Sequence, residues 1–262
     1  MPISFSLTTK KTNTMKIIAL PIIIGMIAAC SQNGSPNEPY ETDSFTTPNQ
    51  RQIHIHALTH ASIRIEFEGH EIEIDPVSKM GNKVIDYKQF PKADFIIVTH
   101  EHYDHLDTAA IKTLTKESTQ LITNKHCADM LGYGTIMANG DQQVINDWLT
   151  IEAVPAYNTT EGHLQFHPKG RDNGFILNID GLRIYIAGDT EDIPEMTDFK
   201  NIDIAFLPCN QPYTMTVEQL VRSARIIKPT VVFPYHYGQT DVTGIPEMLK
   251  DDGIDVLIRH YE

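Results

Sequence analysis

The sequence predicts a single domain of mixed α/β type, in which β-sheets are covered by helices. Apolar residues alternate with polar ones from Gln52 to Ile74, which is typical of short antiparallel strands. From Phe95 onward, strand-like and helix-like segments alternate, an order that favours helices packed on sheets. The chain of 262 residues is 41% hydrophobic and 21% charged, so it can bury a sizeable core.

The first half of the domain begins with a meander of strands. Alternating apolar residues place strands at 53–57, 63–67 and 72–74, with Glu68-Gly69-His70 as a hairpin turn. The apolar run Phe95–Val98 indicates a buried strand, and Asp107 caps the helix expected through about Thr115. A short strand at 121–122 and a short helix at 125–131 follow.

The second half repeats both kinds of element. Strands are expected at 143–145 and 149–154, and a hairpin at 174–187 turns at Asp180-Gly181. A strand at 204–207 precedes a helix at 216–227 that Thr216 caps. The last elements are a strand at 231–233, a short helix at 245–250 and a strand at 254–258.

The N-terminus carries a different signal. Thirteen apolar residues from Ile17 to Ala29 follow Lys16, which is too short for a spanning helix of roughly 20 residues and fits a secretory signal. The ending I-A-A-C resembles the lipobox of bacterial lipoproteins, in which Cys30 would be the lipidated first residue. This resemblance implies membrane attachment in the cell envelope, at the outer membrane or periplasm of a Gram-negative cell. The alternative to a signal peptide is a buried N-terminal helix in which the cysteine is incidental. The start codon is either Met1 or Met15.

Composition also suggests where the folded domain begins. Residues 31–50 are rich in Ser, Pro, Asn and Thr and lack apolar periodicity, so we expect a flexible tether there and a globular domain over 51–262. The formal net charge of −13 argues against nucleic-acid binding, which needs clustered Lys and Arg. Cys127 and Cys209 could pair in an exported protein, but we expect both to be free and buried. The oligomeric state stays open.

The stretch from Phe95 to Asp107 carries the strongest chemical signal. His100, His102, Asp104 and His105 fall within six positions directly after a buried strand. His100 and His102 are two residues apart in a loop, so both rings can face one ion, and Asp104 and His105 can face a second. Imidazole and carboxylate ligands suit Zn²⁺, and Mn²⁺ or Fe also bind such sets.

Later segments offer further ligands near strand ends. Asp189 follows a strand within A-G-D-T, and His236 follows another within P-Y-H-Y-G. His167 lies in H-P-K-G shortly before the Gly174 hairpin, and His163, four residues earlier, is the less favoured alternative. Ligands at strand ends are what a site built on a rigid sheet requires.

Together these motifs resemble the metallo-β-lactamase-fold hydrolase superfamily. The segments T-H-A-S-I-R-I and E-I-D-P resemble its branch containing ascorbate-6-phosphate lactonase and N-acylphosphatidylethanolamine phospholipase D. The resemblance runs from about Ile53 to Gly238 and implies a four-layer αββα sandwich with two metal ions at one edge.

The resemblance also implies a role for each residue. It gives His100, His102 and His167 to the first ion, and Asp104, His105 and His236 to the second, with Asp189 bridging the two. Asp75 would contact one of the ligand residues rather than an ion, and would orient that residue. His60 would line the pocket beside Asp104 and Asp189 as a catalytic group, although a structural hydrogen-bonding role is an equal alternative.

The resulting hypothesis is metal-assisted hydrolysis, in which water held by both ions attacks a phosphodiester, ester or lactone bond. Substrates would be small molecules or lipid-derived compounds, and Lys169 and Arg171 could meet a substrate anion. The alternatives are a lactonase or an amide or β-lactam hydrolase of the same fold, and a non-catalytic metal-binding envelope protein.

Overall fold

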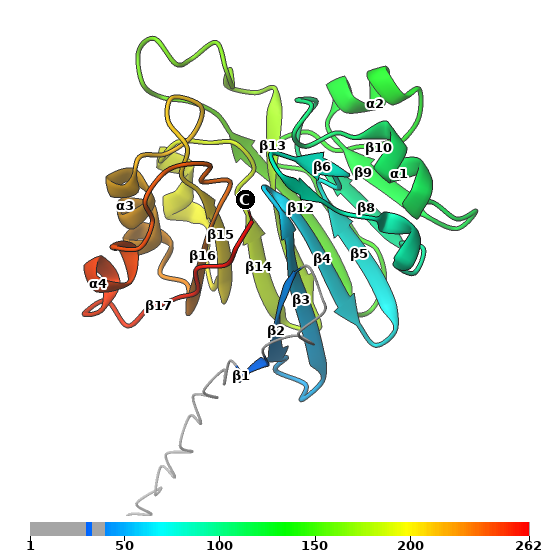
Figure 1. Cartoon of the computed structure of the whole chain (residues 1–262), viewed down its shortest axis with the longest axis horizontal. Coiled ribbons are helices and arrows are strands. Elements are labelled where there is room, and N and C mark those ends of the chain that lie inside the picture. The colour runs from blue at the N-terminus through cyan, green and yellow to red at the C-terminus, as the bar shows by residue number, and fades with distance from the viewer. Residues whose placement is uncertain (1–29, 33–39, 262) are drawn as a thin grey trace, which may run out of the picture.

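A computed structural model of the chain describes residues 30–32 and 40–261 (Figure 1). The predicted signal peptide comprises residues 1–30 and ends at Cys30, and residues 1–29 of it lie outside the described residues. No helix in the described part is long and apolar enough to cross a membrane.

Two large sheets face each other in the described part of the chain. The first has eight strands, which in spatial order are β1 (Cys30–Gln32), β2 (Glu41–Thr46), β3 (Gln52–Thr59), β4 (Ser62–Phe67), β5 (His70–Ile74), β8 (Phe95–Val98), β9 (Gln120–Thr123) and β10 (Thr135–Ile136). The second has seven, which are β11 (Gln142–Val144), β12 (Leu149–Ala156), β13 (Asp172–Ile179), β14 (Leu182–Ile186), β15 (Ile204–Pro208), β16 (Val231–Tyr235) and β17 (Asp255–Val256). The strands β6 (Lys79–Met80) and β7 (Lys83–Val84) form a separate two-stranded sheet.

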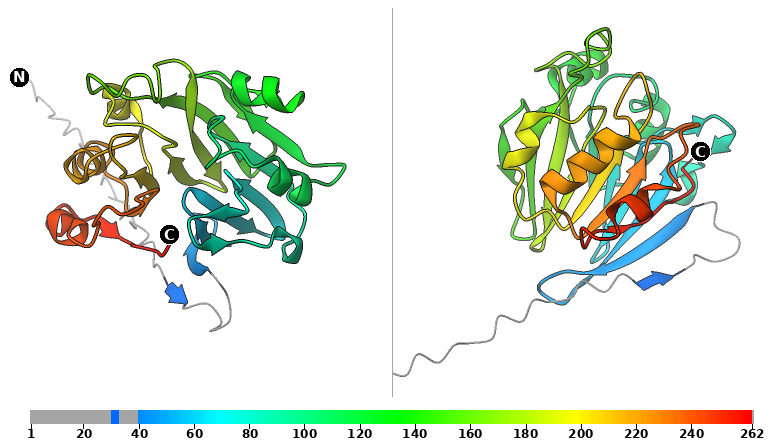
Figure 2. Two further views of the ribbon diagram at one scale, coloured as in Figure 1. Left: turned by 45° about the horizontal axis from the view of Figure 1, so that its top comes forward. Right: turned by 90° about the vertical axis from the view of Figure 1, so that its left-hand side faces the viewer.

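Helices cover the outer face of each sheet (Figures 1 and 2). The 3-10 helix η1 (Tyr87–Gln89), α1 (Thr108–Leu114) and α2 (Lys125–Leu131) accompany the first sheet. The 3-10 helix η2 (Pro194–Asp198), α3 (Val217–Ile227) and α4 (Ile245–Leu249) accompany the second.

Three apolar clusters fill the spaces between these four layers. The largest joins the inner faces of both sheets, including Phe45, Ile63 and Phe206. The other two lie between the second sheet and its helices, and between the first sheet and its helices. Three interfaces make four layers, so the expected αββα sandwich is confirmed.

Local sequence signals placed the main turns and caps correctly. The Asp107 side chain accepts hydrogen bonds from the backbone N–H groups of Ala109 and Ala110 at the start of α1. Thr216 and Gln219 form a reciprocal capping box at the start of α3. Asp180 and Gly181 both have positive φ, 53° and 89°, as a tight two-residue hairpin turn requires.

The prediction that residues 31–50 form a tether is wrong for the part that is described. Residues 41–46 form β2, which pairs antiparallel with β3 along its full length. Phe45 is fully buried, and its ring contacts Phe233 edge-on at 6.2 Å. The folded domain therefore includes residues from about Tyr40, not only those from Arg51.

Polar partners explain why β2 does not look like a strand. Asp43 is buried because Arg259 clamps its carboxylate through two hydrogen bonds of 2.6 and 2.9 Å. The hydroxyl of Ser44 bonds the His54 ring, and that of Thr42 bonds the His56 ring, each at 2.8 Å. These bonds satisfy the polar side chains of β2 within the fold.

Cys127 and Cys209 are free and buried, as predicted.

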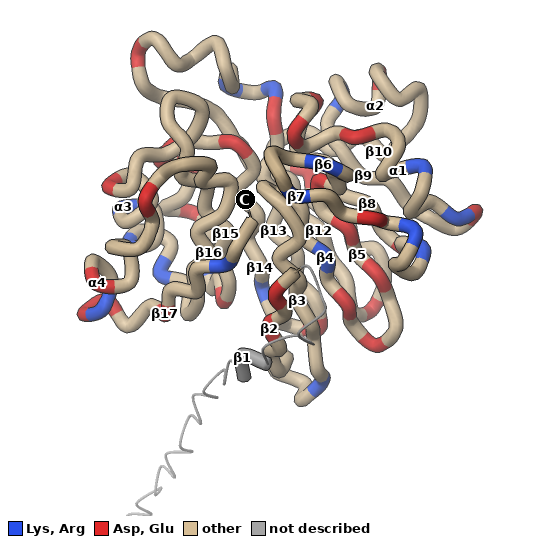
Figure 3. Tube along the Cα trace, viewed as in Figure 1, with Lys and Arg blue, Asp and Glu red and all other residues tan. Residues whose placement is uncertain are grey.

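Basic and acidic residues are interspersed along the described trace (Figure 3).

Candidate metal centre

The predicted ligands meet at one edge of the sandwich. The neighbouring strands β5 and β8 run parallel, as do β14, β15 and β16, so their carboxyl ends lie at common edges. Asp75, His100, Asp189 and His236 each follow one of these strands by one to three residues. His60 joins them from the β3–β4 turn, because the His236 backbone N–H donates to the His60 carbonyl at 3.1 Å.

The first group of candidate ligands comprises His100, His102, His167 and Asp189. One potential ligand atom from each lies within 4.8 Å of all the others. Nε2 of His100 and Nδ1 of His102 are 3.1 Å apart, and Nε2 of His167 is 3.3 Å from Oδ2 of Asp189. Two ligand atoms at about 2.0–2.1 Å from one tetrahedral ion are roughly 3.3 Å apart, so these separations fit a shared ion.

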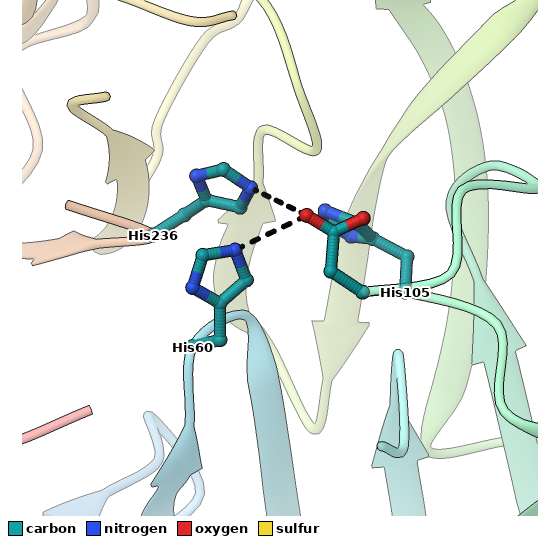
Figure 4. A group of neighbouring side chains, drawn as sticks. His60, His105 and His236 are labelled. Atoms are coloured by element: carbon teal, nitrogen blue, oxygen red, sulfur yellow. Dashed lines mark ion pairs between the residues drawn. The ribbon is translucent and has the colours of Figure 1, made fainter. Parts of the chain in front are cut away.

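The second group comprises His60, Asp104, His105 and His236. One potential ligand atom from each again lies within 4.8 Å of all the others. Figure 4 shows the rings of His60 and His236 pointing at one carboxylate oxygen, which is Oδ2 of Asp104 at 3.4 and 3.7 Å. Nε2 of His105 faces the same space. The structure thus places His60 beside the predicted ligands of the second ion.

Asp189 lies between the two groups. Its Oδ2 is 3.3 Å from Nε2 of both His167 and His236, and its Oδ1 is 3.3 Å from Nε2 of His105. A single buried carboxylate therefore faces histidines of both groups, which is the position predicted for a bridging ligand.

Asp75 contacts a candidate ligand of the second group, His105, which is the role that the resemblance implies for it. Its fully buried carboxylate bonds Nδ1 of His105 at 2.8 Å and accepts two hydrogen bonds of 2.7 Å from the Thr99 N–H and hydroxyl. Because Nδ1 is held in this way, Nε2 of His105 is left to face an ion.

Asp172 has the corresponding role for the first group, and the sequence gave no reason to single it out. Its Oδ2 bonds Nδ1 of His167 at 2.9 Å, and Arg171 binds both of its carboxylate oxygens, at 2.7 and 2.9 Å. Arg171, expected to meet a substrate anion, thus belongs to the support of His167. An aspartate five residues after a histidine is too common a pattern to mark this contact.

The alternative ligand His163 lies outside both groups. Its Nδ1 is 3.3 Å from Oε1 of the buried Glu191. Oε2 of Glu191 accepts hydrogen bonds from the backbone N–H and hydroxyl of Thr159 and Thr160, all between 2.7 and 2.9 Å. Glu191 therefore anchors the loop that precedes His167, and His167 rather than His163 lies among the candidate ligands.

Backbone conformation near the ligands is unusual. His60, Asp75 and His236 have φ of 51°, 43° and 47°, in the left-handed region that few non-glycine residues adopt. Gly188 has φ of 63°, and a Cβ there would lie 2.8 Å from the Asn173 carbonyl oxygen, so only glycine fits before Asp189. The His60 N–H and the Thr59 hydroxyl both donate to the Tyr261 carbonyl, at 2.8 and 3.1 Å.

Mutual electrostatics set the charge states of the site. Burial and the charge of His105 lower the pKa of His100 well below its ordinary value. Burial would raise the pKa of Asp189, but His236 and His105 hold it well below the usual range. Burial opposes a charged His236, yet Asp189 and Asp104 raise its pKa to about 9. Protons thus occupy part of the cluster, and an ion that binds there displaces them.

The donor set fits divalent transition metals. Imidazole nitrogens and carboxylate oxygens are the ligands of such ions, and most of these side chains are buried. Among the described residues, Nε2 of His105 and Oδ1 of Asp189 make no hydrogen bond of acceptable geometry although they are 3.3 Å apart. Buried polar atoms without hydrogen bonds are uncommon, and a bound ion would satisfy both.

A four-layer αββα sandwich with such clusters at its edge defines a metal-dependent hydrolase of the metallo-β-lactamase fold. The chain belongs to the family described as the beta-lactamase superfamily domain, whose model matches residues 54–236. The superfamily prediction is confirmed.

Relatives and solved structures agree with this assignment. The chain is 34% identical over 206 residues to the UPF0173 metal-dependent hydrolase of Pyrococcus furiosus, covering 74% of this chain and 88% of the relative. A crystal structure from Parabacteroides distasonis, provisionally named a metal-dependent hydrolase, has a TM-score of 0.82 and 50% identity and covers 85% of this chain and all of that one. The metallo hydrolase Igni18 from Ignicoccus hospitalis has a TM-score of 0.66 and 25% identity, over 78% of this chain and 93% of its own.

Proposed function

We propose that this hydrolase holds two divalent ions, Zn²⁺ first and Mn²⁺ or Fe as alternatives, and cleaves an ester, lactone or phosphodiester bond. The observation that carries the proposal is the position of Asp189, whose carboxylate faces histidines of both ligand groups at 3.3 Å. A carboxylate in that position suits a pair of ions better than a single one.

The ligand groups divide as the distances suggest. His100, His102 and His167 would hold one ion, Asp104, His105 and His236 the other, with Asp189 shared. Ions held there would lower the pKa of water toward neutrality and would polarise the bond to be cleaved.

The protein's own residues provide order and orientation. Asp75 and Asp172 fix the ring orientation of His105 and His167 through Nδ1. Asp104 and His60 line the cavity in front of the cluster, and the Asp104 side chain is 16% exposed. In this proposal they would touch substrate and orient a proton on an attacking or departing oxygen.

Metal analysis with matched variants tests the proposal. Purified protein should carry about two transition-metal ions per chain, and His167→Ala should lose metal while the neighbouring His163→Ala retains it. Asp104→Ala should abolish turnover without unfolding the chain. Equal metal content in the two histidine variants would contradict the ligand assignment, and metal-loaded protein that turns over no ester, lactone, amide or phosphodiester would indicate a non-catalytic metal-binding protein.

We also propose that the chain is exported and anchored in the cell envelope through lipidated Cys30. The support is the thirteen-residue apolar segment that ends in I-A-A-C. Labelling with a radioactive fatty acid should mark the wild-type protein and not Cys30→Ser. Labelling of both, or of neither, would contradict the anchor.

A further inference from the structure

The cavity at the candidate metal centre is lined in part by apolar and aromatic side chains. It has a volume of about 350 Å³. Apart from the candidate ligands and His60, its lining consists of Met80, Tyr103, Phe166, Asn210 and Tyr213. Ligand pockets span roughly 300–1,000 Å³, so this one suits a compact group rather than a pair of lipid chains.

Two aromatic rings from different loops make up one wall of this cavity. Phe166 and Tyr213 pack edge to face, with ring centroids 5.0 Å apart. The buried Asn158 ties the loops together, because its amide donates to the Tyr213 carbonyl at 2.9 Å and its N–H to the His167 carbonyl at 2.9 Å. The wall is thereby fixed relative to a metal ligand.

The cationic side chains near the cavity are turned to other partners. Lys169 pairs with Glu195 at 2.7 Å and lies over the Tyr157 ring. Arg171 is held by Asp172 and lies 3.4 Å from Glu101. Met80 lines the cavity, whereas its neighbour Lys79 is exposed and does not. None of the residues described as lining the cavity is Lys or Arg.

This lining selects among the bonds that the proposed function allows. A phosphodiester would bring a negative charge into a cavity whose lining includes Asp104 and Asp189 and no Lys or Arg, so only the ions could offset that charge. A phosphate or carboxylate elsewhere on the substrate would lose its hydration without gaining a charged partner. An uncharged group of small size would instead bury apolar area against Met80, Phe166 and Tyr213.

We infer that the substrate is a neutral carboxylic ester or lactone whose compact apolar or aromatic acyl group packs against Phe166 and Tyr213. This inference rests on the proposed hydrolase function and narrows it. One water is consumed: its oxygen bonds to the acyl carbon, the acyl C–O bond breaks, and a proton goes to the departing alkoxide. The products are a carboxylic acid and an alcohol, joined in one hydroxy acid when the substrate is a lactone.

The test compares substrates that release the same chromophore from metal-loaded protein. p-Nitrophenyl acetate, butyrate and benzoate differ only in the acyl group, and bis(p-nitrophenyl) phosphate presents an anionic diester. We expect kcat/KM to be greater for butyrate and benzoate than for acetate, and lowest for the phosphodiester. Phe166→Ala and Tyr213→Ala should each reduce the butyrate-to-acetate ratio by about tenfold, because a few methylenes in a pocket are worth that much.

Leu164→Ala is the matched control. Leu164 lies in the same loop as Phe166 but is 49% exposed and does not line the cavity. Its variant should keep the wild-type ratio, and the metal content of every variant should stay at the wild-type level. Tyr213 is itself 45% exposed, so its substitution should leave the fold intact.

The possible results distinguish a failure of this inference from a failure of the proposed hydrolase function. Faster cleavage of the phosphodiester than of every ester would overturn the ester assignment and leave the hydrolase function standing. An unchanged acyl preference in both aromatic variants would also overturn it. No turnover of these four substrates or of a simple lactone by fully metal-loaded protein would contradict both.

Discussion

Replacing Asp75 with Asn should weaken binding of the second ion while leaving the protein folded. The carboxylate of Asp75 bonds the Thr99 N–H, the Thr99 hydroxyl and Nδ1 of His105 at 2.7 to 2.8 Å. Asparagine has the same shape and tolerates the positive φ of 43° at this position. Asparagine, however, has only one accepting oxygen in its side chain. If that oxygen keeps the hydrogen bond from the Thr99 N–H, the NH₂ group of the amide faces Nδ1 of His105.

The consequence is a change of tautomer. An amide N–H that donates to Nδ1 favours the proton on Nε2, which is the nitrogen that must face the ion. Loss of such a supporting contact typically costs 10–100-fold in metal affinity, or about 1.4–2.7 kcal/mol. Competition with a chromophoric chelator, combined with metal analysis, should therefore show one of the two dissociation constants raised by that factor.

Asp180→Asn provides a matched control. Asp180 is also buried and has φ of 53°, but it binds Thr47, Asn49 and Arg51 at the β13–β14 turn and takes no part in the ligand groups. Its substitution should lower stability and leave both dissociation constants unchanged. If folded Asp75→Asn protein binds both ions as the wild type does, the tautomer argument is refuted.

Three further predictions concern stability and reactivity. Phe45→Ala should cost about 3–5 kcal/mol in urea unfolding because the ring is fully buried, whereas Val144→Ala, at a 72% exposed position, should change little. Burial opposes ionisation of Glu191, but hydrogen bonds from Thr159 and Thr160 lower the pKa of its carboxyl to about 2. The carboxylate therefore stabilises the fold fully above the unfolded pKa of about 4.3, and this stabilisation is lost as the pH falls toward 2. Glu191→Gln should show a shallower loss of stability over that range, and an equal loss would refute its role. Burial raises the pKa of Cys127 and Cys209 to about 12, so a thiol reagent at neutral pH should modify them only after denaturation.

Sequence patterns predicted those features that depend on near neighbours in the chain. The His100–His105 cluster, the Asp107 cap and the Asp180-Gly181 turn each require residues only a few positions apart, and all three lie where the sequence placed them. Distant candidate ligands such as Asp189 were predicted because their motifs resemble those of a known superfamily.

Features that depend on distant partners were missed. Asp43 in β2 is satisfied by Arg259, 216 residues later, so the strand shows no apolar alternation of its own. The support of His167 by Asp172, and the anchoring of its loop by Glu191, follow from how the loops fold back. The composition of the cavity wall is likewise set by two loops meeting in space, which is why substrate class could not be read from motifs.

The hydrogen bonds from His60 and Thr59 to the Tyr261 carbonyl bear on how the protein is made. Thr59 and Tyr261 are separated by 202 positions, so the turn that carries His60 lacks this support until synthesis has passed residue 261. Domains otherwise begin to fold from the N-terminal side while the chain is elongating. Complete loading of the second group with metal should therefore require the segment that carries Tyr261 to be in place, and a change that displaces Tyr261 should impair loading even though that residue is not among the candidate ligands.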